Sequence, residues 1–240
     1  MIRRLCALLL ALAAGWACPV AAAGTGADML SEAEIARLAE LGFDALPLTA
    51  VVEMVSAREP AWPFEANPDA VDARQLACVR SRMGTDHLRQ AMLERTREHA
   101  RVDPSGLREG LRFLEDGGAV LFRASMRQAV EAAVDGTIPD AQALEASATP
   151  EQRHATMALL LAEHYRPLRA LFGMPEPPRH DFETGVAVGA TMVRVLLAPV
   201  LTGALEACAV PLSVLDAPAP VGKPAPVDEP PPIEVYDVYD

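Results

Sequence analysis

Five residues in the second half of the sequence carry side chains that acid–base or metal chemistry would need. They are Glu151, His154, His164, His180 and Asp181. Glu151 and His154 form a Glu-x-x-His pair, which places a carboxylate and an imidazole on one helix face, as in bundles that hold two metal ions. A hydrolase or a metal-dependent enzyme would have to bring at least three of the five residues into one cleft. This is one hypothesis for the function.

The sequence lacks the remaining parts of such a site. A bundle metal site needs a second Glu-x-x-His and further carboxylates on facing helices, and the sequence has no second copy. Glu151 also falls in a first helical turn, where the helix dipole accounts for a carboxylate. No Gly-rich phosphate loop, nucleophile elbow or His-Glu-x-x-His is present. We therefore expect no metal and no cofactor, and the sequence assigns no catalytic residue.

Residues 1–23 have the pattern of a cleaved bacterial signal peptide. A positive start at Arg3 and Arg4 is followed by an apolar run and by small residues before Gly24. The run is shorter than the roughly 20 apolar residues that a transmembrane helix needs. We expect cleavage before Gly24 and a periplasmic protein. The alternative is lipid attachment at Cys18, which would tether the protein to the membrane.

Two cysteines, Cys78 and Cys208, remain after removal of the signal peptide. Exported proteins seldom keep unpaired thiols, so the sequence predicts a disulfide between them. The alternative is two separate buried thiols that behave as small apolar side chains. The spacing is too wide for a zinc site, which needs clustered ligands.

The formal net charge of −12 argues against nucleic acid as a partner, because phosphates are bound mainly by basic side chains. The basic residues are nearly all arginine, and Lys223 is the only lysine.

Helix start and stop signals recur from Ser31 onward, while strand-like alternation is almost absent. We expect an all-α fold, a single irregular bundle of about six to eight helices over residues 31–212, after a short linker over 24–30. Ser31 and Glu34 predict a capping box, and Gly42 predicts the end of that first helix. Thr149 predicts another start, followed by one central helix through Phe172.

The apolar stretch from Val186 to Leu205 is long enough to raise the question of a membrane span. Arg194 at its centre costs about 2.5 to 3.5 kcal/mol on insertion scales, and Pro199 weakens the helix. We expect a helix in the core of a soluble domain. Insertion of this stretch is the second route to a membrane-tethered protein.

Residues 213–240 are rich in proline and acidic residues, which predicts a disordered tail. Its end repeats Val-Tyr-Asp around Tyr236 and Tyr239, a segment that could dock in extended form on a partner. The alternative is a solvated acidic end.

Three stretches carry a resemblance to known sequences: Ala61-Trp62-Pro63, the residues from Gln75 to Arg80, and the residues from Gly106 to Met126. Together they resemble uncharacterised helical proteins exported by gammaproteobacteria, a domain of unknown function. Leu114 stands where that family has a second aromatic residue. The resemblance implies a helical fold and a periplasmic location, and it transfers no activity.

The leading functional hypothesis is a non-catalytic module that binds a protein or an amphiphilic ligand through an interhelical groove or through its tail. A groove for an amphiphile would expose an apolar patch of several hundred Å². The enzyme and the membrane-tethered protein are the alternatives.

Overall fold

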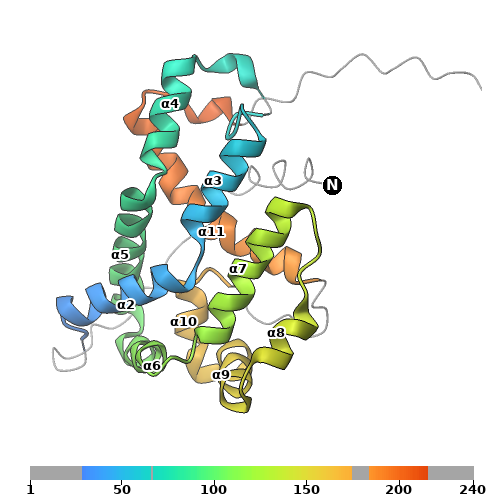
Figure 1. Cartoon of the computed structure of the whole chain (residues 1–240). Helices are drawn as coiled ribbons and strands as arrows, with labels where there is room; N and C mark the ends of the chain where they lie inside the picture. Colours follow the sequence, from blue (N-terminus) through green and yellow to red (C-terminus); the bar gives the residue numbers. More distant parts are fainter. Residues whose placement is uncertain (1–28, 66, 175–183, 216–240) are drawn as a thin grey trace, which may run out of the picture.

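The computed structural model describes residues 29–65, 67–174 and 184–215, which form ten α-helices and three short 3₁₀ helices without a β-strand (Figure 1). The all-α class is confirmed. The helices of the described residues are α2 (Glu32–Ala45), α3 (Leu48–Arg58), η2 (Pro68–Ala70), α4 (Ala73–Arg82), α5 (Thr85–Val102), α6 (Pro104–Glu115), α7 (Val120–Asp135), α8 (Ala141–Ser147), α9 (Pro150–Leu161), η3 (Glu163–Tyr165), α10 (Arg166–Leu171), α11 (Thr184–Ala207) and η4 (Leu212–Val214).

Reciprocal capping boxes start three of these helices, and the sequence predicted two of the starts. In α2 the backbone N–H of Glu34 donates to Ser31 Oγ at 3.2 Å, and the backbone N–H of Ser31 donates to Glu34 Oε2 at 2.7 Å. Thr149 starts α9 in the same way, and Asp72 starts α4. Each box satisfies two N–H groups that the helix itself cannot pair.

The prediction that the first helix ends at Gly42 is wrong, because α2 continues to Ala45. Gly42 serves packing instead of termination. A Cβ atom at this position would lie 3.3 Å from Cε1 of Phe172, a ring that is fully buried. The missing side chain therefore lets α2 approach the core closely.

The apolar run after Thr149 does not form one central helix. It breaks after Leu161, where Ala162 is extended, and continues as η3 and α10. This break is one reason that the described residues form more helices than the six to eight expected. Leu161 is 59% exposed, so only part of the run enters the core.

Arginine side chains satisfy the carbonyl groups at the C-terminal ends of several helices. Arg169, which is 4% exposed, donates from Nη1 to the carbonyls of Leu159 (3.0 Å) and Ala162 (2.7 Å) at the break after α9. The same role at the ends of other helices is filled by Arg58 for α7, Arg80 for α3, Arg95 for α10 and Arg153 for α8. These carbonyls have no partner within their own helix, and the planar guanidinium can donate to two or three of them at once.

The core lies where α2, α5, α6, α10 and α11 meet. In Figure 1, α2 lies beside α5 and α6, while α11 crosses the molecule and packs against α4 and α5. Trp62 and Phe64, in the loop after α3, fold back into this core. Leu30, in the stretch expected to be a linker, is also buried there.

Helix α11 contains the whole stretch that raised the membrane question. Among the described residues, no helix combines the length and the apolar character that a membrane crossing requires. Met192, Leu197 and Leu205 of α11 are buried in the core of the domain.

The predicted disulfide between Cys78 and Cys208 is confirmed. It joins α4 to the residue that follows α11, with 5.9 Å between the two Cα atoms. Three other expectations lie outside the described residues: the signal peptide with Cys18, most of the C-terminal tail, and the docking segment with Tyr236 and Tyr239.

Candidate functional site

The structure brings together few of the residues proposed for an enzyme. Glu151 and His154 are exposed on α9, and His164 is exposed in η3, where its ring centroid lies 4.2 Å from that of Tyr165. His180 and Asp181 lie outside the described residues. Within the part of the chain that the structure describes, no three His, Cys, Asp or Glu side chains gather as metal ligands.

The interactions of Glu151 fit a carboxylate in the first turn of a helix, as the helix dipole favours. Its pKa is lowered chiefly by a hydrogen bond from its own backbone N–H and next by one from the Thr149 side chain. These are the interactions of a carboxylate at a helix start, where unpaired N–H groups point outward. Glu151 therefore has the interactions of an acidic residue in the first turn of α9.

His99 has the most strongly shifted imidazole among the described residues, and it also has a structural explanation. Burial on α5, together with the smaller effect of the Arg95 charge, lowers its pKa to about 4. Both causes favour the neutral ring.

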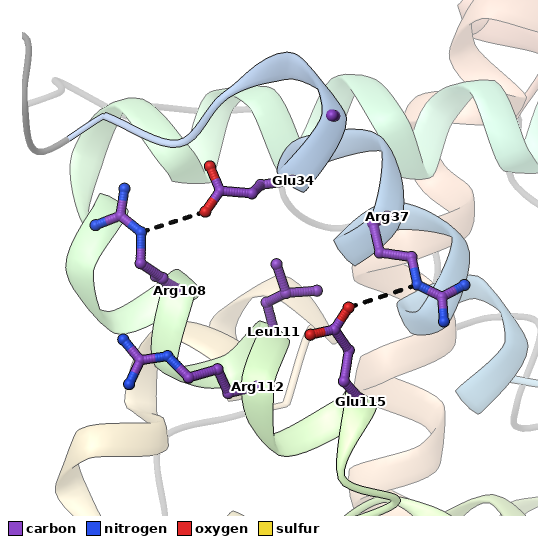
Figure 2. Close-up of a pocket in the computed structure, with 7 residues that line it drawn as sticks. Glu34, Arg37, Arg108, Leu111, Arg112 and Glu115 are labelled. Carbon is purple, nitrogen blue, oxygen red and sulfur yellow. Dashed lines mark hydrogen bonds and ion pairs between the residues drawn. The ribbon is translucent and has the colours of Figure 1, made fainter.

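A different cluster forms a surface depression of about 370 Å³ between α2 and α6. Figure 2 shows the charged side chains of the two helices gathered around Leu111. We call this depression the α2–α6 groove. Its lining residues are Ala33, Glu34, Arg37, Arg108, Leu111, Arg112 and Glu115.

Helical spacing brings these side chains to one place. On α6 the spacing of three and four residues puts Arg108, Leu111 and Arg112 on one face, with Glu115 one turn further along. The packing of α2 against α6 sets this face opposite Glu34 and the next turn of α2. Two segments about seventy residues apart in the sequence thus share one surface.

Two ion pairs bridge the α2–α6 groove, one on each side of Leu111 (Figure 2). Arg108 Nε lies 3.4 Å from Glu34 Oε1, and Arg37 Nε lies 3.7 Å from Glu115 Oε1. Exposed pairs of this kind contribute about 0–1 kcal/mol each. They are weak enough for a ligand group to replace.

Glu34 and Arg108 hold one side of the groove in place. Hydrogen bonds from the Ser31 backbone and the Ser31 side chain lower the pKa of Glu34, and Arg108 lowers it further. Arg108 also donates from Nη2 to the carbonyl of Met29 at 2.8 Å. The guanidinium of Arg108 is therefore oriented before any ligand arrives.

The side chain of Arg112 is exposed and makes no hydrogen bond or ion pair with the described residues. It follows Arg108 by four residues, and the two side chains extend toward the same side of the groove (Figure 2). Like charges at this spacing repel each other. An anion between the two guanidinium groups would remove that repulsion, so the arrangement is suited to binding a carboxylate.

The charge of the chain is unevenly distributed, which the overall net charge does not show. Residues 73–127, which include α4, α5 and α6, hold eleven arginines and seven acidic residues, a net charge of +4. The remaining residues carry a net charge of −16. The α2–α6 groove lies at the edge of the basic part.

A second depression, of about 270 Å³ between α2 and α5, is less suited to an anion. Its single lining cation, Arg89, lies 3.4 Å from Glu40 and 5.1 Å from the centroid of the Phe43 ring. Asp86 adds a second carboxylate to the lining. The α2–α6 groove is therefore our candidate functional site.

Comparison with known proteins adds no family to this description. No protein-family model, no curated protein and no solved structure matches the chain.

Proposed function

We propose that this protein is an exported, non-catalytic binding module that holds an acidic segment of a partner protein in the α2–α6 groove. The observation that carries the proposal is Arg112, whose guanidinium has no partner among the described residues and lines the same groove as the oriented Arg108. This is the interhelical-groove form of the hypothesis drawn from the sequence.

The chemistry of the groove favours a peptide carboxylate over other anions. Arginine binds a carboxylate through two parallel N–H donors, which gives both energy and orientation. Glu34 and Glu115 at the same site would repel the dense charge of a phosphate backbone. They could instead accept N–H groups from a peptide. An apolar side chain of the peptide would contact the exposed Ala33 and the small part of Leu111 that is accessible, since Leu111 is only 6% exposed.

A protein partner fits the groove better than an amphiphile does. An acyl chain needs apolar walls, whereas five of the seven lining side chains are charged. The most exposed large apolar side chains, such as Ile138 at 91%, lie on other elements.

Export is supported by two observations. The Cys78–Cys208 disulfide suits an oxidising compartment, where unpaired thiols are rare. The first 23 residues have the composition of a signal peptide. We infer a periplasmic location from the two together.

The proposal is tested with a fluorescent probe peptide of about ten alternating Glu and Leu residues, titrated with the oxidised full chain at low salt. We expect measurable binding to the unmodified protein. For Arg112→Glu the dissociation constant should be about tenfold larger, because the variant loses one guanidinium–carboxylate contact and gains a repulsion between carboxylates, together about 1.4 kcal/mol. The matched control is Arg127→Glu, an exposed arginine on α7 outside the groove. Absence of binding, or equal weakening by both variants, would refute the proposal.

A further inference from the structure

The chain carries its own acidic segment beyond the described residues. Residues 216–240 contain six acidic residues, seven prolines and the single Lys223, a net charge of −5. This segment is opposite in charge to residues 73–127, which carry +4 and supply Arg108 and Arg112. The sequence therefore holds both halves of a possible intramolecular interaction.

We propose that the acidic end of the chain, residues 228–240, occupies the α2–α6 groove when no partner is bound. This inference rests on the proposed function, because it assumes that the groove binds acidic peptides. The partner would then have to displace the tail, so the chain regulates its own binding site.

The length of the segment permits this contact. Residues 216–227 link Leu215, the last described residue, to the docking segment, and twelve extended residues span up to about 40 Å. A compact domain of roughly 180 residues has a radius of gyration near 16 Å. The link is therefore longer than twice that radius, so the docking segment can reach across the domain.

Covalent attachment makes a weak interaction sufficient. A tether of this length presents its end at an effective concentration on the order of 1 mM. An intrinsic dissociation constant of about 0.1–0.5 mM would therefore fill about two thirds to nine tenths of the grooves. Bidentate hydrogen bonds between carboxylates and the two guanidinium groups are the interactions that would supply this affinity.

The spacing of the acidic residues matches a guanidinium-lined groove. Glu234, Asp237 and Asp240 recur at every third position. A polyproline II chain has three residues per turn, so in that conformation the three carboxylates would share one edge at a spacing of about 9 Å. Tyr236 and Tyr239 would share another edge, where a ring could contact Leu111.

The test compares the affinity of the Glu-Leu probe peptide for three full-length chains. The first is the unmodified protein, and the second carries Glu234→Gln, Asp237→Asn and Asp240→Asn. The third is a control with the same change in net charge, made at exposed acids of α7 and α8: Glu131→Gln, Asp135→Asn and Glu145→Gln. We expect the tail variant to bind the probe about three- to tenfold more tightly than the unmodified protein, because the groove is no longer occupied. The control should stay within about twofold.

Combining the tail changes with Arg112→Glu shows whether the gain in probe affinity arises at the groove. If the tail acts through the groove, the gain in affinity should disappear in the Arg112→Glu background. A gain that persists there would overturn the inference, and so would equal probe affinities of the unmodified and tail-variant chains. If the unmodified and tail-variant chains bind the probe equally, the inference fails but the proposed function stands. If the probe binds none of the chains, the proposed function fails and the inference fails with it.

Discussion

Replacing Arg95 by methionine should lower the free energy of unfolding by about 2 kcal/mol. Arg95 extends from α5 to the end of α10, where its Nε donates to the Leu171 carbonyl at 2.8 Å and its Nη2 donates to the Ala170 carbonyl at 2.6 Å. The group is largely buried, and that burial lowers its pKa. Methionine keeps most of the apolar stem and removes both donors.

The magnitude follows from what each carbonyl group loses. The Leu171 carbonyl loses its Arg95 donor, and a partly buried acceptor left without a hydrogen bond should cost about 1.5 kcal/mol. The Ala170 carbonyl keeps the backbone N–H of Gly173 at 3.0 Å, so the loss of Arg95 there should cost only about 0.5 kcal/mol. The matched control is Arg97→Met on the same helix. Arg97 donates to Glu32 at 2.9 Å in an exposed ion pair, and its loss should cost no more than about 1 kcal/mol.

Urea unfolding of the oxidised proteins at neutral pH, followed by far-ultraviolet circular dichroism, measures both changes. Equal m-values would show that the variants unfold from comparable states. The capping role of Arg95 is refuted if Arg95→Met loses less than about 1 kcal/mol, or no more than Arg97→Met loses.

Three further predictions concern stability. Replacing Cys78 and Cys208 together by alanine should lower the free energy of unfolding by about 3–5 kcal/mol, since the disulfide closes a loop with a sequence separation of 130; denaturant unfolding measures it. The free energy of unfolding should fall as the pH drops from 6.5 towards about 4. In that window His99 takes up a proton in the unfolded chain but not in the folded one. For this partly buried ring the loss should be about 2 kcal/mol, measured by urea unfolding at a series of pH values. Gly118→Ala should cost about 1–3 kcal/mol, because its Cβ would lie 2.3 Å from Cε2 of Phe113; thermal unfolding checks it.

Each of these predictions has a control or an outcome that would contradict it. Reduction of the unmodified protein should match the double cysteine variant, and a mismatch would mean that alanine itself perturbs the core. In His99→Leu the slope of stability against pH should flatten, and an unchanged slope would assign the effect to another group. Gly136→Ala places a Cβ where no atom lies within 4 Å, although φ is +69° there, so it should cost only about 1 kcal/mol. Equal losses at Gly118 and Gly136 would contradict the steric argument.

Local signals in the sequence predicted the structure best. The reciprocal bonds of Ser31 with Glu34, and of Thr149 with Gln152, involve residues three apart, so the sequence alone contains them. The ends of helices depended on distant contacts. Gly42 lies inside its helix, where the absence of a side chain leaves room for the Phe172 ring. The break after Leu161 is stabilised by Arg169.

The groove was harder to predict because it too depends on contacts between residues far apart in the sequence. Arg108, Leu111 and Arg112 have the spacing of an ordinary amphipathic helix. What makes them a candidate site is the placement of Glu34 and Arg37 opposite them, and helical periodicity does not tell which helices become neighbours. The concentration of arginine in residues 73–127 is present in the sequence, and these residues include the helix that carries Arg108 and Arg112.

The disulfide also determines how the protein would respond to a pulling force. If the chain were drawn out by its two ends, tension would pass from Cys78 directly to Cys208 and bypass the intervening helices α5 to α11. Only the segments outside that link, including α2 and α3, would bear the load. The bypassed loop, with a sequence separation of 130, corresponds to roughly 430 Å or more of extended chain. Reduction of one covalent bond would therefore expose most of the length of the domain to mechanical unravelling.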